Sequence, residues 1–250
     1  MFIKYIYDGT FEGLLTCIYE AYYSKYKPEK IEASKRHVPD LIHQEITIET
    51  SFEHAEVVLS AIESKISKAV LEKIYIAYLS ESSDCEINIL NYIRLGFKLG
   101  SNLELHMHNK FVIDVNTIYS RVLKEAHLLL GFIRFKSIND QILYSSIEPD
   151  NNILTIIAPH FAERFSSEKW IINDVKRKLA VLYDGTSKWV LAPFSTDTSK
   201  KFIDSPDSEY EHLWRNYFKT IAIKERENPK LQKRLMPKRY WKHIFETNND

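Results

Sequence analysis

The chain has 250 residues, of which 44% are hydrophobic and 13% aromatic, a composition typical of globular proteins rather than of disordered chains. Its 34 basic and 34 acidic side chains give a formal net charge of zero. This balance excludes a uniformly basic protein that coats nucleic acid, so any basic surface must be local.

The two cysteines, Cys17 and Cys85, lie far apart, which excludes a disulfide framework, a four-cysteine zinc site and a self-contained iron–sulfur cluster. We expect both to be buried as small apolar residues. Asp8 and Glu12 argue against an N-terminal signal peptide, and no apolar run approaches the roughly 20 residues of a membrane span. The sequence therefore predicts a cytoplasmic protein with no membrane contact, no metal and no cofactor.

The first 50 residues open with an alternating, β-rich stretch at residues 2–7, which predicts a strand. A turn follows, and Thr10 is placed to cap a helix from Phe11 to about Tyr26. Residues 27–45 predict a surface connection, with a further strand around residues 44–48.

The next 80 residues show helical periodicity. Four helices are expected: one that begins after Ser51, and three that run over Ser67–Tyr78, Asp84–Leu99 and Val115–Leu130. Residues 1–130 therefore predict a mainly helical portion.

From residue 131 the pattern changes to short β-rich stretches separated by polar turns. Strands are expected at residues 131–136, 142–149 and 152–159, with two more within residues 170–193. Residues 131–193 thus predict a small antiparallel sheet with one short helix near residues 160–165. A loop is expected over residues 195–208 and a helix over residues 209–226, within a basic helical portion at 209–246. The whole is an α+β fold, expected to form one domain over residues 1–250.

Catalytic motifs are scarce, with no Gly-x-Ser-x-Gly sequence and no glycine-rich phosphate loop. His160, Glu163 and Asp174 are the candidates for acid–base work, because the first two would be neighbours on a helix. A solvated helix face explains the same pattern. His106 and His108 could share a metal ion, but no third ligand has a suitable spacing, and a polar loop explains them better.

Two arginines are candidates for binding an anion. Arg134 lies in the stretch GFIRF, where an arginine opposite a buried aromatic face would suit a carboxylate or phosphate. A structural ion pair with Glu125 or Glu148 is an equally good interpretation. Arg164, in the predicted short helix, would extend the same surface.

The clearest signal is a basic stretch at residues 211–243, which holds six lysines and four arginines against three glutamates. Such local charge in a neutral chain is expected of an electrostatic footprint for nucleic acid. The interleaved aromatic side chains suit stacking on unpaired bases, although a core-facing helix needs a similar spacing. The candidate contacts are Lys230, Lys233, Arg234, Lys238, Arg239, Tyr240 and Trp241, with Tyr240 and Trp241 expected either to stack or to anchor the segment.

Several stretches, in chain order, resemble a bacterial family described as a probable DNA-metabolism protein and built on a domain of unknown function. They are YDGTFEGLLTCIYEAY (7–22), KEAHLLLGFIRF (124–135), IEPDNNIL with APHFAERF (147–165), WIINDVKRKLAVLYDG (170–185) and RENPKLQKRLMPKRYWKHIFE (226–246). The resemblance implies a companion of a radical-SAM protein in DNA modification or repair.

Two features of that family are missing from this chain. Some relatives carry a uracil-DNA-glycosylase-like domain, for which there is no room here, and the CxxxCxxC motif of the radical-SAM enzyme is absent. Leu128 stands where the family pattern places a basic residue after His127, which puts a phosphate contact at that position in doubt.

Three functions follow as hypotheses. The first is an accessory protein of DNA repair or modification that binds nucleic acid, a radical-SAM partner or both. The second is an enzyme acting on a damaged or modified base or nucleotide, with His160, Glu163 and Asp174 as acid–base groups. The third is a protein docking module without nucleic-acid contact.

Overall fold

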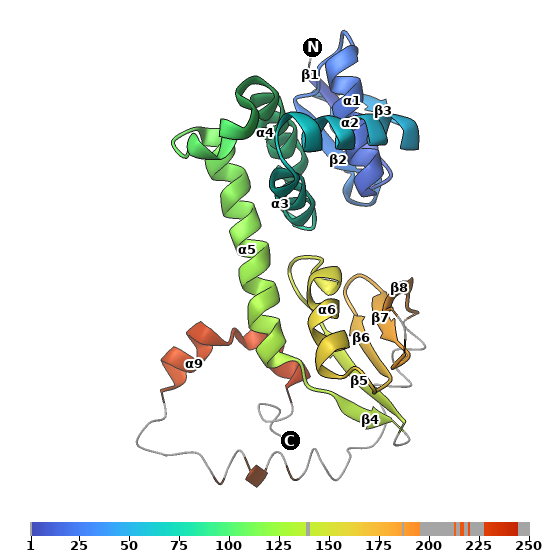
Figure 1. Cartoon of the computed structure of the whole chain (residues 1–250), viewed down its shortest axis with the longest axis vertical. Coiled ribbons are helices and arrows are strands. Elements are labelled where there is room, and N and C mark those ends of the chain that lie inside the picture. Colours follow the sequence, from blue (N-terminus) through green and yellow to red (C-terminus); the bar gives the residue numbers. More distant parts are fainter. Residues whose placement is uncertain are drawn as a thin grey trace. The chain divides into compact units, whose positions relative to one another are not determined.

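The computed structural model describes residues 2–138, 141–186, 188–195 and 228–244, together with Leu213, Asn216, Tyr217 and Thr220. The chain divides into two compact units, Met1–Leu123 and Lys124–Asp250, here called unit 1 and unit 2 (Figure 1). The fold mixes α and β structure. The expectation of one domain stays a prediction, and the loop and helix predicted over residues 195–226 lie almost wholly outside the described residues.

Unit 1 combines helices with a parallel three-stranded sheet of order β2-β1-β3. The strands are β1 (Phe2–Tyr7), β2 (Lys30–Ala33) and β3 (His43–Thr47). The helices are α1 (Phe11–Tyr23), α2 (Phe52–Lys65), α3 (Lys68–Tyr78), α4 (Cys85–Leu99) and the first part of α5 (Lys110–Phe132), with 3-10 turns η1 (Ser34–Arg36) and η2 (Gly100–Leu105). The predicted helical portion therefore also contains a sheet, whose strand β2 is too short and polar to be recognised from its sequence.

Three predicted helix starts of unit 1 are confirmed by their caps, whereas Asp84 makes no side-chain cap hydrogen bond at α4 and α5 begins at Lys110 instead of the predicted Val115. The Thr10 hydroxyl accepts a hydrogen bond from the Gly13 amide at 3.0 Å. Ser51 and Ser67 cap α2 and α3 in the same way. Each cap satisfies an amide that the first helical turn leaves without a partner. Helix α1 ends at Tyr23, earlier than the predicted Tyr26.

The core of unit 1 is built from β1, α1 and the faces of α2 to α5 that turn toward them. Cys17 and Cys85 are buried and free, as predicted. The largest buried side chains of this core include Tyr5, Tyr7, Leu14, Leu15, Ile18, Ile62 and Tyr92.

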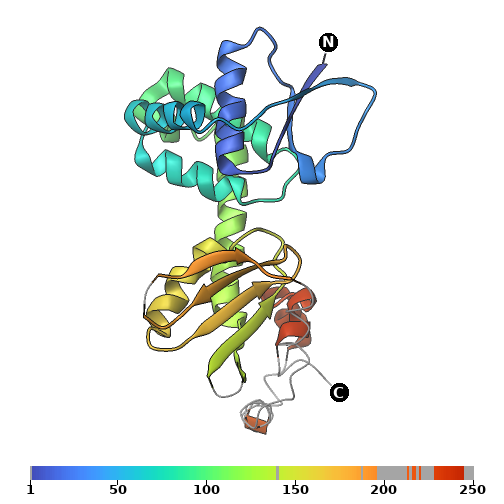
Figure 2. The same cartoon turned by 90° about the vertical axis from the view of Figure 1, so that its right-hand side faces the viewer.

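Unit 2 carries a five-stranded sheet of order β4-β5-β6-β7-β8 (Figure 2). Its strands are β4 (Lys136–Ile138), β5 (Ile142–Ile147), β6 (Trp170–Asp174), β7 (Leu179–Tyr183) and β8 (Val190–Pro193). Helix α6 (Leu154–Arg164) joins β5 to β6, and the last described elements are α9 (Pro229–Leu235) and the 3-10 turn η4 (Lys238–His243). No helix among the described residues is long and apolar enough to span a membrane.

Three predictions for unit 2 are wrong. Residues 152–159 belong to α6 and not to a strand, because Leu154, Ile157, Ala158 and Phe161 are buried at helical spacing. This helix is the crossover that the parallel pairing of β5 with β6 requires, so the sheet is mixed and not antiparallel throughout. The predicted strand at 131–136 is also wrong, since α5 runs to Phe132 and β4 begins only at Lys136.

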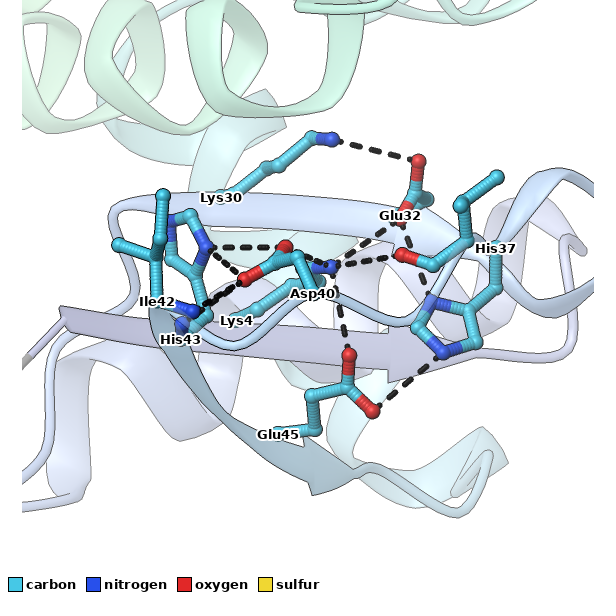
Figure 3. Close-up of polar contacts among 9 residues, drawn as sticks. Lys4, Lys30, Glu32, His37, Asp40, Ile42, His43 and Glu45 are labelled. Carbon is cyan, nitrogen blue, oxygen red and sulfur yellow. Dashed lines mark hydrogen bonds and ion pairs between the residues drawn. The ribbon is translucent and has the colours of Figure 1, made fainter.

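A buried lysine holds the connection between β2 and β3. These strands flank β1 on opposite sides, so residues 34–42, here called the strap, must cross one face of the sheet. Figure 3 shows Lys4 of β1 beneath this strap. The Lys4 ammonium, fully buried, lies 2.5 Å from Asp40, 3.3 Å from Glu45 and 3.7 Å from Glu32.

The charges around Lys4 stabilise one another. The hydrogen bond to Asp40, followed by that to Glu45, raises the pKa of Lys4 in spite of burial. In turn Lys4, with His43, holds the pKa of the Asp40 carboxyl well below its usual value. His37 bridges Glu32 and Glu45 with a contact of 3.3 Å on each ring nitrogen. A buried ammonium is tolerated only with such compensation.

Replacing Lys4 with Met should lower the melting temperature of unit 1 by several degrees. The substitution leaves three neighbouring carboxylates without their shared cation, which is more costly than removing an exposed partner. Lys30→Met is the matched control, since Lys30 is one-third exposed and pairs with Glu32. Thermal unfolding followed by circular dichroism tests this, and equal melting temperatures for the two variants would contradict it.

The ion pairs of Lys4 with Asp40, Glu45 and Glu32 also predict that the stability of unit 1 is sensitive to acid. The Asp40 carboxyl stays ionised to lower pH in the folded chain than in the unfolded chain. Its contribution to the free energy of unfolding is therefore complete above about pH 4 and is lost as the pH falls further. The melting temperature should therefore fall below about pH 4, and it should fall less in Lys4→Met, which lacks the cation responsible. Melting curves from pH 6 to pH 2 measure both slopes, and parallel slopes would rule out this role of Lys4.

Candidate nucleic-acid interface

The described part of the predicted basic stretch is residues 228–244, here called the basic segment. It contains four lysines and two arginines and no acidic residue, and all six cationic side chains are exposed. Asn228 caps α9 by accepting a hydrogen bond from the Leu231 amide at 3.0 Å, and Pro229 begins the helix. The basic segment thus forms the helix α9 followed by the 3-10 turn η4.

One buried carboxylate anchors this segment to unit 2. Glu125 of α5 accepts hydrogen bonds from the amides of Asp150 and Asn151, each at 2.8 Å. It also accepts from the Asn151 side-chain amide at 2.6 Å and from the Tyr240 hydroxyl at 2.5 Å. A buried carboxylate is tolerated when it is satisfied in this way. Glu125 therefore joins α5, the turn after β5 and η4.

Tyr240 is the part of the basic segment that the anchor holds. Its side chain is only 2% exposed, and its ring lies 6.0 Å from that of Phe132. Burial, reinforced by the hydrogen bond to Glu125, raises the pKa of the phenol, so the hydroxyl keeps its proton and donates it. Ile244 is also buried. Of the two roles predicted for Tyr240, anchoring is the one compatible with this burial.

The cations of the basic segment differ in how they are neutralised. Arg239 pairs with Asp150 at 2.7 Å, and Lys242 pairs with Glu148 at 2.5 Å. Lys238 lies 5.8 Å from the centre of the Trp241 ring. Lys230, Lys233 and Arg234 make no ion pair with any other residue that the structure describes. Their i, i+3, i+4 spacing places them on one side of α9, which is therefore a ready cationic face.

Trp241 links the two parts of the segment. Its indole Nε1 donates a hydrogen bond to the Met236 carbonyl at 2.9 Å, and the ring is half-buried. The rest of α9 is open, since Leu231 and Leu235 are 47% and 58% exposed. The basic segment thus presents exposed apolar surface as well as charge.

The two further arginine candidates lie outside the basic segment. The Arg134 guanidinium donates to the carbonyls of Gly131 and Ile133, at 2.8 and 3.3 Å, and so caps the end of α5. Arg164 is exposed at the end of α6, 5.8 Å from the ring of Phe165.

The acid–base candidates occupy different environments. His160 and Glu163 are exposed on α6. Asp174 is fully buried at the end of β6 and forms an ion pair with Arg177 at 2.6 Å. Among the described residues no hydrogen bond or ion pair joins Asp174 to His160 or Glu163, and their acid–base role stays a prediction. The His106 and His108 rings lie 5.8 Å apart, and no group of three or more metal-ligating side chains occurs among the described residues.

Sequence reasoning missed Glu125 as an anchor. Its position in the sequence could have revealed it, because Glu125 falls in the apolar stripe of α5 formed by Val122, Ala126 and Leu129. A lone acid in a buried stripe indicates a specific set of donors.

Replacing Glu125 with Gln should loosen the basic segment. The side-chain nitrogen of Gln is itself a donor and would face the donors that now bind the carboxylate. This mismatch destabilises the attachment of η4 by about 2 kcal/mol and increases the population in which η4 is detached roughly thirtyfold. Trypsin cleavage after Lys238, Arg239 or Lys242 should rise accordingly, as followed by mass spectrometry. Glu163→Gln, on the exposed side of α6, is the control. Unchanged cleavage in Glu125→Gln would show that the carboxylate does not hold η4.

A family model described as a domain of unknown function (DUF4130) matches residues 83–246, about two thirds of the chain. The match includes α4, the anchor and the whole basic segment. No curated protein and no solved structure matches the chain. The chain therefore belongs to the DUF4130 family, whose function its description leaves open.

Proposed function

We propose that the chain is an accessory protein of DNA repair or modification that binds nucleic acid through the basic segment. The observation that carries the proposal is the set of six exposed cations in residues 228–244, a stretch that itself contains no acidic residue. The DNA setting and a radical-SAM partner rest on the sequence resemblance alone, and a cytoplasmic location rests on cysteine content and on the absence of a signal-peptide pattern in the sequence.

The distribution of charge supports this proposal. Residues 124–250 hold 21 basic and 17 acidic side chains, whereas residues 1–123 hold 13 and 17. A polyanion is therefore attracted to unit 2 and repelled by unit 1, which orients its approach. Phosphate contacts made by lysine and arginine supply most of the affinity in sequence-independent binding.

The ion pairs of the segment indicate which cations bind first. Lys230, Lys233 and Arg234 can contact phosphates without breaking an ion pair to a described residue. Arg239 and Lys242 must first exchange Asp150 and Glu148 for phosphate. We therefore assign the first contact to α9, with Lys238 and Trp241 following along the strand. Arg134 and Arg164 would extend the surface.

The triple substitution of Lys230, Lys233 and Arg234 by Ala should weaken binding to a duplex by an order of magnitude or more. Each lost phosphate contact lowers the slope of log affinity against log salt by about 0.9, so three should lower it by about 2.7. Fluorescence anisotropy across a salt series measures both quantities.

The matched control replaces Lys25, Lys27 and Lys68, three exposed lysines of unit 1, and changes the net charge equally. If the two triple variants weaken binding to the same extent, net charge and not the basic segment drives it. If the unaltered protein does not bind the duplex at low salt, the proposal is wrong.

A docking module is the second candidate, favoured by the exposed Leu231 and Leu235 on α9. Apolar side chains gain little from phosphates but suit a groove on a protein partner. Under this alternative, Leu231→Ser with Leu235→Ser abolishes co-purification with the partner. That co-purification should also survive nuclease and high salt.

A further inference from the structure

One carboxylate of unit 2 lies between two basic side chains of η4. Glu148 follows the end of β5, and its Oε2 atom pairs with the Lys242 ammonium at 2.5 Å. Its Oε1 atom lies 3.6 Å from Nε2 of the His243 imidazole, which is too far for a hydrogen bond but within reach of an ion pair. The lysine therefore holds the carboxylate, and the histidine next to it in the sequence does not.

The His243 imidazole lacks a partner on the side that faces this carboxylate. Its side chain is only 14% exposed, and its Nε2 atom is buried without a hydrogen-bond partner among the described residues. A buried imidazole nitrogen left in this way is costly, so an acceptor that reached it would be held. Glu148 is the acidic side chain that lines the same small hollow as His243.

The other side chains around His243 carry no charge. Those that line the hollow are Leu129, Phe132 and Ile133 of α5, Ser146 and Ile147 of β5, and Tyr240 and Ile244 of the basic segment. The Tyr240 hydroxyl is bound to Glu125, and the neighbouring Arg239 pairs with Asp150. Glu148 and Lys242 are thus the two charged groups that act on the imidazole.

The present arrangement keeps His243 neutral. Burial lowers the pKa of the imidazole, Glu148 opposes this shift, and the Lys242 ammonium adds to it. The ring is therefore neutral at pH 7. An anion that paired with Lys242 would change this balance in two ways, because it would screen the positive charge and would leave the Glu148 carboxylate to approach Nε2.

The site can also accommodate the charged form of the ring. The Nδ1 atom lies 3.0 Å from the Ser146 hydroxyl, which can donate to a neutral nitrogen and accept from a protonated one. The hollow has room for about one water molecule, so the Glu148 carboxylate can close on Nε2 without displacing a packed side chain. Protonated His243 would then have an acceptor at each ring nitrogen.

We propose that Glu148 passes from Lys242 to His243 when a phosphate binds Lys242, and that this exchange couples phosphate binding to the uptake of a proton by His243. The phosphate takes the ammonium, the released carboxylate pairs with the imidazolium, and the proton comes from solvent. The inference rests on the proposed function and adds a regulation to it. Binding by η4 strengthens as the pH falls through the range in which histidine titrates.

The exchange can be tested first without nucleic acid. The imidazole signals of the full chain are followed by NMR from about pH 8 to about pH 5, and His243 is identified by the loss of its signals in His243→Gln. Lys242→Met should move the titration of His243 to higher pH, and it should do so far less in a chain that also carries Glu148→Gln. Lys238→Met, whose lysine lies over the Trp241 ring, is the matched control and should leave the titration unchanged.

The comparison of the two backgrounds decides the result. An equal movement with and without the Glu148 carboxylate would overturn the exchange, because Lys242 would then act on His243 by direct repulsion alone. The exchange is equally wrong if Lys242→Met leaves the titration of His243 where it is. Lys242 is exposed, so its replacement leaves the core of unit 2 intact.

Binding at different pH values gives the second measurement. At constant salt, the affinity of the unaltered chain for a short duplex should rise several-fold from about pH 7.5 to about pH 6, with about tenfold per pH unit as the limit for one proton. His243→Gln should lose most of this rise. His127→Gln removes an exposed histidine of α5 and should keep it, which separates the exchange from the general gain of positive charge at lower pH.

These outcomes distinguish the inference from the proposed function. Salt-dependent binding with the same pH dependence in the unaltered chain and in His243→Gln would contradict the coupling and leave the basic segment as a phosphate contact. If the unaltered chain binds no duplex at low salt, the proposed function and the coupling are both wrong.

Discussion

The Glu125 carboxylate is the constraint on which the arrangement of unit 2 depends. It is buried in α5, so it must be satisfied by donors, and it takes them from Asp150, Asn151 and Tyr240. Two of these donors fix the turn after β5, and the third fixes η4. Without this carboxylate, a chain section with four lysines and two arginines would be held by apolar contacts, by the partly exposed ion pairs of Arg239 and Lys242, and by the contact of His243 with Ser146.

The anchor also sets which charges are available. Because η4 is held, Arg239 and Lys242 come within reach of Asp150 and Glu148, while α9 extends beyond those acids. The cations nearest the anchor are therefore partly neutralised and those furthest from it are not. A polyanion that approaches unit 2 would contact α9 first and η4 only by competing with carboxylates.

Local signals predicted much of the fold but little of its long-range chemistry. Thr10, Ser51 and Ser67 cap helices where the sequence places them, since a cap needs only its own turn. A strand is predicted at residues 152–159 because β-branched residues are frequent there, although Leu154, Ile157 and Phe161 have helical spacing. The basic segment was visible as composition, whereas the partners of Tyr240 and His243 come from residues about 100 positions away. Such pairings are decided by tertiary structure, which a single sequence does not display.

The buried Lys4 has a consequence for how the strap can change. Surface connections usually accept insertions and deletions, because their backbone contacts few other parts of a protein. Here Asp40 faces inward to the ammonium, while its neighbours Val38, Leu41 and Ile42 are exposed. Adding or removing one residue would bring an apolar side chain over the lysine and move the carboxylate into solvent. The length of this loop is therefore fixed by a single buried charge, and variation among related chains should be confined to the identities of its exposed residues.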